Sequence, residues 1–174
     1  MRRFEATLGA VGVAWAALAV TGCLSTFPLE PAPAKPVDPK LTGVWRCLPS
    51  DEDATAEVAT LTIRRATDRT YAVTFQAKDE DASRYDAYAT KIGRATFVNL
   101  RDLDAEGAPW DYARYSFLLP DVLQVRMVQE TLLRNVERTP ASFREAIRLH
   151  LDDPALYGDF CVCVRAKEKE SAAQ

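Results

Sequence analysis

The sequence predicts a mainly β domain: a small antiparallel β-barrel of about eight strands, with one amphipathic helix before the last strand. Apolar and polar residues alternate with period two in 56–65 and 70–78, as they do in strands with one buried face. Short candidate strands then recur at roughly regular spacing, which is typical of a barrel or a sandwich. The further candidates are 41–47, 84–92, 95–101, 110–118, 122–129 and 159–166.

The chain begins with a short basic stretch and an apolar run. Arg2 and Arg3 precede residues 8–20, which carry no charge. The run is shorter than the ~20 apolar residues that a spanning helix needs. A basic start, a short apolar run and an exit through small residues are typical of a secretion signal. We therefore expect residues 1–22 to be a signal peptide.

The exit from this run is Val20-Thr21-Gly22-Cys23. It resembles the lipobox of bacterial lipoproteins, in which a branched apolar residue and two small residues precede a cysteine. The resemblance implies a lipid on the Cys23 sulfur, cleavage between Gly22 and Cys23, and a fatty acyl group such as palmitate on the new amino terminus. The alternative is an uncleaved anchor with an incidental cysteine.

The resemblance also implies an address in the cell envelope. Two or three acyl chains would hold the protein on a membrane, because each buried methylene contributes ~0.8 kcal/mol. Leu24 stands where aspartate commonly retains lipoproteins in the inner membrane. We therefore expect a lipid anchor in the outer membrane, with the domain facing the periplasm.

Residues 23–40 contain five prolines, at positions 28, 31, 33, 36 and 39. Proline fixes φ and removes a backbone donor, so neither a helix nor a central strand is expected. We expect an extended, semi-rigid stalk between the lipid and the domain, at ~3.1 Å per residue. The alternative is a proline-rich recognition ligand.

Residues 41–166 are expected to form one domain, followed by a polar tail, 167–174. About 130 residues are enough for one hydrophobic core. The whole chain has 22 basic and 25 acidic residues and a formal net charge of −3. This balance argues against nucleic acid as a partner, because phosphates require a basic face.

The domain opens with LTGVWRC, which contains Gly43-x-Trp45. This looks like the G-x-W of the first strand of lipocalin-like barrels. The resemblance implies that Gly43 allows a close chain approach and that Trp45 closes the barrel floor. It implies no ligand residues. Lipocalins place their helix after the eighth strand, whereas the helix expected here precedes the last strand.

That helix is expected at 140–151. Thr139 suits the N-cap and Pro140 the first helical position. Phe143 and Ile147 then share one face. We expect this helix to cover one end of the barrel.

Three cysteines lie in the domain: Cys47, Cys161 and Cys163. Exported thiols tend to be oxidised. In a closed barrel the first strand neighbours the last, so Cys47 could bond to Cys161 or Cys163. The alternatives are reduced core thiols and a Cys-x-Cys metal site, which the single histidine makes the least favoured.

The alternation in the last strand complicates that pairing. Phe160, Val162 and Val164 read as the inward face, which would turn Cys161 and Cys163 outward. Cys47 shares the inward face of Trp45. A bulge near the closure would reconcile the two.

No catalytic motif, cofactor site or metal site is expected. His150 is the only histidine, and it reads as a structural residue of the helix. Aromatic side chains with a few polar tips suit a pocket mouth for a small apolar ligand. The candidates for such a pocket are Tyr85, Tyr88, Trp110, Tyr112, Arg114 and Tyr115, with ordinary sheet packing as the alternative.

Two functional classes follow. The first is a non-enzymatic binding or structural lipoprotein that contacts an apolar ligand or an envelope partner. The second is an envelope enzyme with an unrecognised active site. A barrel interior filled by large side chains would favour the first class, and a cavity with buried polar groups would favour a ligand or chemistry.

Overall fold

A computed structural model describes residues 25–49 and 58–167 of the chain. The predicted signal peptide, Cys23 and its cleavage site lie outside the described residues, and so does almost all of the polar tail. The structure therefore bears on the domain and on most of the proline-rich segment.

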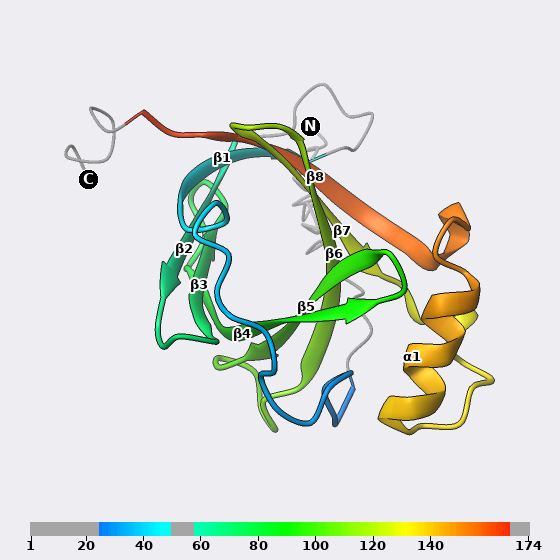
Figure 1. The fold of residues 1–174 in the computed structure, drawn as a ribbon. Helices are drawn as coiled ribbons and strands as arrows, with labels where there is room; N and C mark the ends of the chain where they lie inside the picture. Colours follow the sequence, from blue (N-terminus) through cyan, green and yellow to red (C-terminus); the bar gives the residue numbers. More distant parts are fainter. Residues whose placement is uncertain (1–24, 50–57, 168–174) are drawn as a thin grey trace, which may run out of the picture.

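Eight antiparallel strands close into one barrel, as the sequence predicts (Figure 1). Each strand pairs with the next in the chain, and the last pairs with the first. The strands are β1 (Gly43–Pro49), β2 (Ala59–Arg65), β3 (Tyr71–Gln76), β4 (Ser83–Ile92), β5 (Ala95–Asp102), β6 (Trp110–Leu119), β7 (Val122–Val128) and β8 (Tyr157–Arg165).

The predicted helix lies between β7 and β8. It is α1 (Pro140–Leu149), flanked by the short 3₁₀ turns η1 (Glu130–Leu132) and η2 (Pro154–Leu156). The side chain of Thr139 caps it by accepting a hydrogen bond from the Ser142 amide. The helix lies beside the barrel rather than over its end, so the expected position was wrong (Figure 1).

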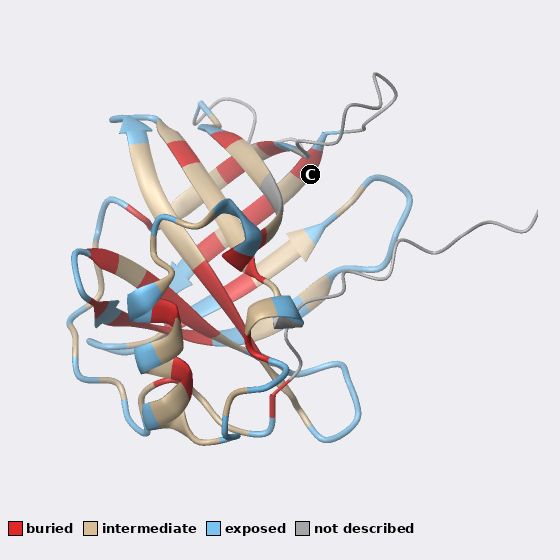
Figure 2. Cartoon of the chain, turned by 90° about the vertical axis from the view of Figure 1, so that its right-hand side faces the viewer, coloured by how far each residue is buried: buried red, intermediate tan, exposed pale blue. Residues whose placement is uncertain are grey.

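The interior of the barrel is formed by alternate residues of the strands. Ala59, Leu61 and Ile63 of β2 belong to one buried cluster with Tyr71 and Val73 of β3. These are the faces that the period-two pattern predicts. Figure 2 shows the buried positions along the strands and on the inner side of α1.

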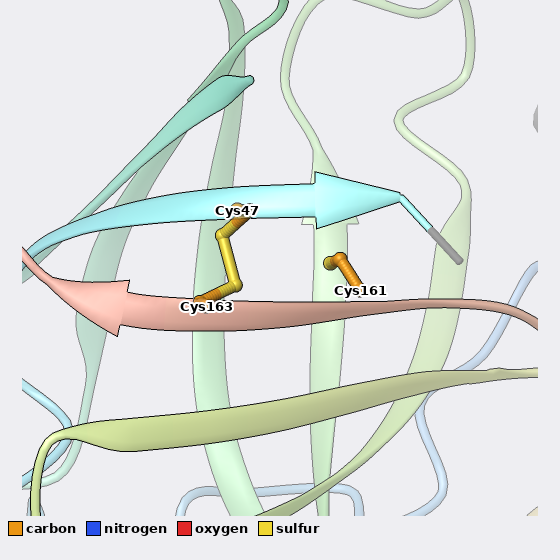
Figure 3. A group of neighbouring side chains, drawn as sticks. All are labelled: Cys47, Cys161 and Cys163. Atoms are coloured by element: carbon orange, nitrogen blue, oxygen red, sulfur yellow. A yellow bond between two sulfur atoms is a disulfide. The ribbon is translucent and has the colours of Figure 1, made fainter. Parts of the chain in front are cut away.

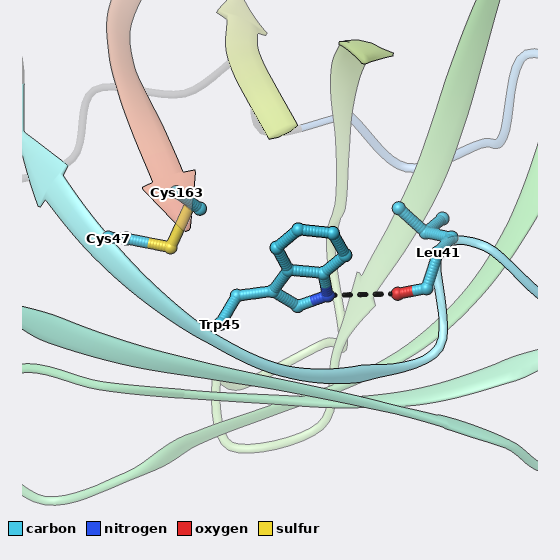
Figure 4. Close-up of a disulfide and its surroundings, with 4 residues drawn as sticks. All are labelled: Leu41, Trp45, Cys47 and Cys163. Atoms are coloured by element: carbon cyan, nitrogen blue, oxygen red, sulfur yellow. Dashed lines mark hydrogen bonds between the residues drawn. A yellow bond between two sulfur atoms is a disulfide. The ribbon is translucent and has the colours of Figure 1, made fainter. Parts of the chain in front are cut away.

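One end of the barrel is closed by a tryptophan floor. Trp45 is fully buried, and its indole N–H donates a hydrogen bond of 3.0 Å to the carbonyl of Leu41 (Figure 4). The guanidinium of Arg165 lies 4.1 Å from the centre of the indole ring and donates to the Thr42 carbonyl at 2.8 Å. Trp45 is therefore buried with partners for its N–H and its ring, as a floor residue would be, and the role itself stays a prediction.

Gly43 is required beside this floor. Its φ of 138° lies in the region that favours glycine. A Cβ atom there would lie 2.5 Å from a guanidinium nitrogen of Arg165. Any larger residue at this position would displace Arg165 from Trp45.

The proline-rich residues do not form a stalk. Residues 25–42, called here the N-terminal segment, are packed on the barrel, with Leu29 and Leu41 buried. The segment has no helix and no strand beyond one isolated bridge, as its prolines predict. It runs over the outer face to the closed end and then enters β1 (Figure 1).

Replacing Trp45 by alanine should destabilise the barrel by ~3–5 kcal/mol, the usual cost of truncating a large core aromatic. Trp45→Phe keeps a ring against Arg165 and loses only the indole hydrogen bond, so it should cost less. Urea unfolding of both variants measures the difference. A Trp45→Ala protein as stable as the wild type would contradict the floor assignment.

Candidate functional site

The six residues predicted to form a pocket do not lie together. Strand alternation turns Tyr85 and Tyr115 into the barrel, where they pack against the interior cluster. The other four point outward from β4 and β6: Tyr88, Trp110, Tyr112 and Arg114. The prediction that the six residues line one pocket mouth is therefore wrong. Neighbouring residues of a strand face opposite sides of the sheet, so these six residues are divided between the inside and the outside of the barrel.

The outward aromatic residues hold the N-terminal segment. Ser25 and Trp110 exchange two backbone hydrogen bonds, of 2.9 and 2.7 Å. The Tyr112 hydroxyl donates to the Phe27 carbonyl at 2.5 Å, and the Tyr88 hydroxyl donates to the Glu30 carbonyl. Trp110, Tyr112 and Tyr88 therefore form hydrogen bonds with the backbone of the segment at three places within six residues.

Asn99 provides a fourth contact, and sequence reasoning missed it. Its side-chain oxygen accepts a hydrogen bond of 2.7 Å from the Leu29 amide. Its side-chain nitrogen donates to Thr90 at 3.0 Å. Asn99 and Leu29 are both fully buried, so this is a satisfied polar pair inside an apolar cluster. The signal in the sequence was one amide between the apolar residues Val98 and Leu100.

The segment shares a second core with α1, outside the barrel. The rings of Phe27 and Phe143 meet edge to face, with centroids 5.1 Å apart. Phe143 also meets Tyr112 at 6.4 Å. Glu30 forms an ion pair with Arg144 of the helix. The helix therefore covers the segment and the outer face of the sheet together.

Arg114 holds the chain that follows the helix. Its guanidinium donates to the Leu151 carbonyl at 3.0 Å and to the Tyr157 hydroxyl at 3.1 Å. His150 ends α1 nearby, with its Nδ1 atom 3.5 Å from an oxygen of Asp153. Both residues have structural partners, as the interpretation of His150 expected.

Among the described residues, one carboxyl group is buried in the barrel interior. Asp111 lies opposite Leu100 of β5, is 8% exposed, and has one side-chain oxygen without a hydrogen-bond partner among the described residues. Burial, and then the charge of Asp102, raises its pKa from 3.8 to about 6. Burial also raises the pKa of Tyr85, and Asp102 and Asp111 add to that shift.

Tyr115 points toward the closed end. Burial raises its pKa, and Tyr71 and Asp38 add to the shift. The Tyr71 hydroxyl accepts a hydrogen bond of 2.6 Å from the Asp38 amide of the N-terminal segment. The two inward tyrosines of the predicted pocket therefore lie in different surroundings, one beside carboxylates and one beside the floor.

A disulfide joins β1 to β8. Cys47 and Cys163 lie directly opposite each other, with an S–S distance of 2.03 Å (Figure 3). It closes a sequence separation of 116 residues, which on the chain-entropy account stabilises the fold by ~4–5 kcal/mol. One of the two pairings that the sequence allowed is therefore present.

The predicted facing of the last strand was wrong. Cys163 is fully buried and Val164 is 52% exposed, so the cysteines face inward and no bulge is needed to bring Cys163 to Cys47. Valine and cysteine are both apolar, and their alternation did not tell the two faces apart. A register shift does occur in β8, nearer to Tyr157.

Cys161 is the remaining thiol of this group. The sulfur atoms of Cys47, Cys161 and Cys163 lie within 4.8 Å of one another. The disulfide uses two of them, which leaves one thiol as a ligand. Burial raises the pKa of Cys161 to about 11, so little thiolate forms at neutral pH. The group fits a structural bond better than a nucleophile or a metal centre.

A groove of about 870 Å³ lies outside the barrel, between the proline-rich part of the segment and β1–β2. Its lining includes Pro36, Val37, Arg64 and Arg65.

Among the described residues, no helix combines the length and the apolarity that crossing a bilayer requires.

Comparisons with models of known protein families, with curated proteins and with solved structures find no match to this chain. The barrel architecture therefore stands on its own strand pairing. The resemblances to lipoproteins and to lipocalin-like barrels remain predictions from sequence.

The pKa of Asp111 predicts a specific pH dependence. Because the folded protein binds this proton more tightly than the unfolded chain, stability should fall as pH rises from about 4 to about 6, by at most ~3 kcal/mol. Asp111→Asn removes this loss, so the variant should be more stable than the wild type at pH 7 and similar to it at pH 4.

Thermal unfolding across this pH range measures the effect. Asp104→Asn is the matched control, because Asp104 lies outside the core in an exposed ion pair with Arg84. If the thermal stability of Asp111→Asn changes with pH as that of the wild type does, the claim that the Asp111 carboxylate is buried without a compensating partner is refuted.

Proposed function

We propose that this chain is a membrane-anchored bacterial envelope lipoprotein whose barrel is a non-enzymatic binding module. The observation that carries the proposal is Val20-Thr21-Gly22-Cys23 after an uncharged apolar run. The lipid on Cys23 would be its membrane partner. Leu24 favours the outer membrane, with the barrel facing the periplasm.

Two features of the domain support export. Disulfides persist in oxidising compartments such as the periplasm, and Cys47 is bonded to Cys163. Ser25, two residues after the proposed lipid site, is already buried against the barrel. A signal cut at Gly22–Cys23 would keep Ser25 and every other described residue in the mature protein.

The arrangement of polar groups supports binding rather than turnover. Tyr88, Tyr112 and Arg114 each donate a hydrogen bond to a backbone carbonyl of this chain. The barrel interior is apolar and aromatic around Asp111, with its floor closed by Trp45. By the criterion given above, an interior filled by large side chains favours a binding or structural module over an enzyme.

The lipid anchor is tested by Cys23→Ala. The wild-type protein from its own membrane should lack residues 1–22 and carry acyl mass on Cys23, whereas the variant should carry none. Cys161→Ala is the matched control and should keep both processing and acylation. Native mass spectrometry reads the acyl mass, and a ligand would appear in the same spectrum.

An intact residue 1, or an unmodified Cys23 in the mature wild-type protein, would overturn the lipoprotein assignment. Reproducible turnover that is lost in Asp111→Asn would overturn the non-enzymatic one.

A further inference from the structure

We infer that the N-terminal segment holds the barrel on the bilayer in one orientation, with the β5–β6 end against the lipid surface. The inference rests on the proposed lipidation of Cys23. It adds a geometric claim, because lipidation alone would allow the domain to hang from a loose stalk at any angle.

The first step is reach. Ser25 is 1% exposed and forms a two-bond bridge with Trp110, the first residue of β6. Cys23 is two residues before Ser25, and two extended residues span at most ~7 Å. The acyl chains on Cys23 must therefore start within ~7 Å of Ser25, which is itself paired with the first residue of β6.

The second step is that the bridge is not an isolated contact. The pairing of β7 with β6 starts at Ala113. Ser25 pairs with Trp110, three residues earlier in β6, where β7 is no longer paired. The Leu29 amide is then fixed on Asn99, and Glu30 is paired with Arg144. If residues 25–42 were released, they would span ~56 Å at ~3.1 Å per residue. Docking therefore removes nearly all the freedom of the tether.

The third step identifies the surface beside the tether. The β5–β6 loop, residues 103–109, starts and ends next to Trp110, because the Asp102 amide bonds to the Pro109 carbonyl at 3.0 Å. Leu103 in this loop is 44% exposed. The Asp104 carboxylate of this loop is paired with Arg84, so Glu106 is the acidic residue that the loop would bring to the lipid headgroups.

The other end of the same strand provides the contrast. Leu119 ends β6 and is 63% exposed. Ten residues at ~3.3 Å each place it ~30 Å from Trp110 along the strand. One exposed leucine therefore lies beside the tether and one lies far from it.

The test uses full-length lipidated protein in phosphatidylcholine vesicles that contain nitroxide-labelled lipid. A fluorophore is attached at Leu103→Cys or at Leu119→Cys, each in a Cys161→Ser background. We expect the lipid nitroxide to quench the label at position 103 several-fold more than the label at position 119. Equal quenching at the two positions in protein that carries its acyl chains would overturn the orientation and leave the lipidation standing.

Two variants separate docking from anchoring. A Gly-Ser insertion of about 12 residues between Leu24 and Ser25 adds ~20 Å of flexible tether without touching the barrel. Asn99→Ala with Tyr112→Phe removes two of the contacts that dock the segment. Both should remove the difference between positions 103 and 119 while the protein stays on the vesicles.

A difference that survives the insertion would mean that the loop surface alone orients the barrel, against the inference. Protein without acyl mass would instead refute the proposed function.

Discussion

The hydrogen bond from the Leu29 amide to Asn99 is the constraint on which the arrangement of the chain depends. Both residues are fully buried, so neither group could pair with water if the contact opened. Leaving a buried donor or acceptor unpaired costs ~1–3 kcal/mol. This contact fixes the middle of the N-terminal segment and thereby joins the helix, the outer face of the sheet and the approach to β1 into one unit.

The two cores divide the work of the fold. The inner core fills the barrel and includes the disulfide, and Trp45 with Arg165 lies at its closed end. The outer core lies between the sheet and α1, and the N-terminal segment contributes Phe27 and Leu29 to it. Release of its first residues would expose apolar surface of the outer core, and release of its last residues, which include Leu41, would expose apolar surface of the inner core.

Sequence patterns predicted the barrel well, because period two in β2 and β3, the cap at Thr139 and Gly43-x-Trp45 are local signals. They failed where the signal was not local. Prolines exclude helix and central strand but do not say whether an extended chain is free or docked; Phe27 and Leu29 among them were the available hint. The pocket failed for another reason, since Tyr88 and Tyr112 lie on the face opposite Tyr85 and Tyr115. In β8, cysteine and valine alternate. Because both are apolar, the alternation did not show which of them faces the barrel interior.

Amide hydrogen exchange at Leu29, followed by NMR, tests the docked segment most directly. The account predicts that this amide exchanges as slowly as the amides of β5, because both require the same opening of the outer core. In Asn99→Ala its protection should fall while that of β2 and β3 is retained. Exchange of the Leu29 amide at the rate of an unstructured peptide in the wild-type protein would contradict the account, because the proline-rich residues would then be a free stalk.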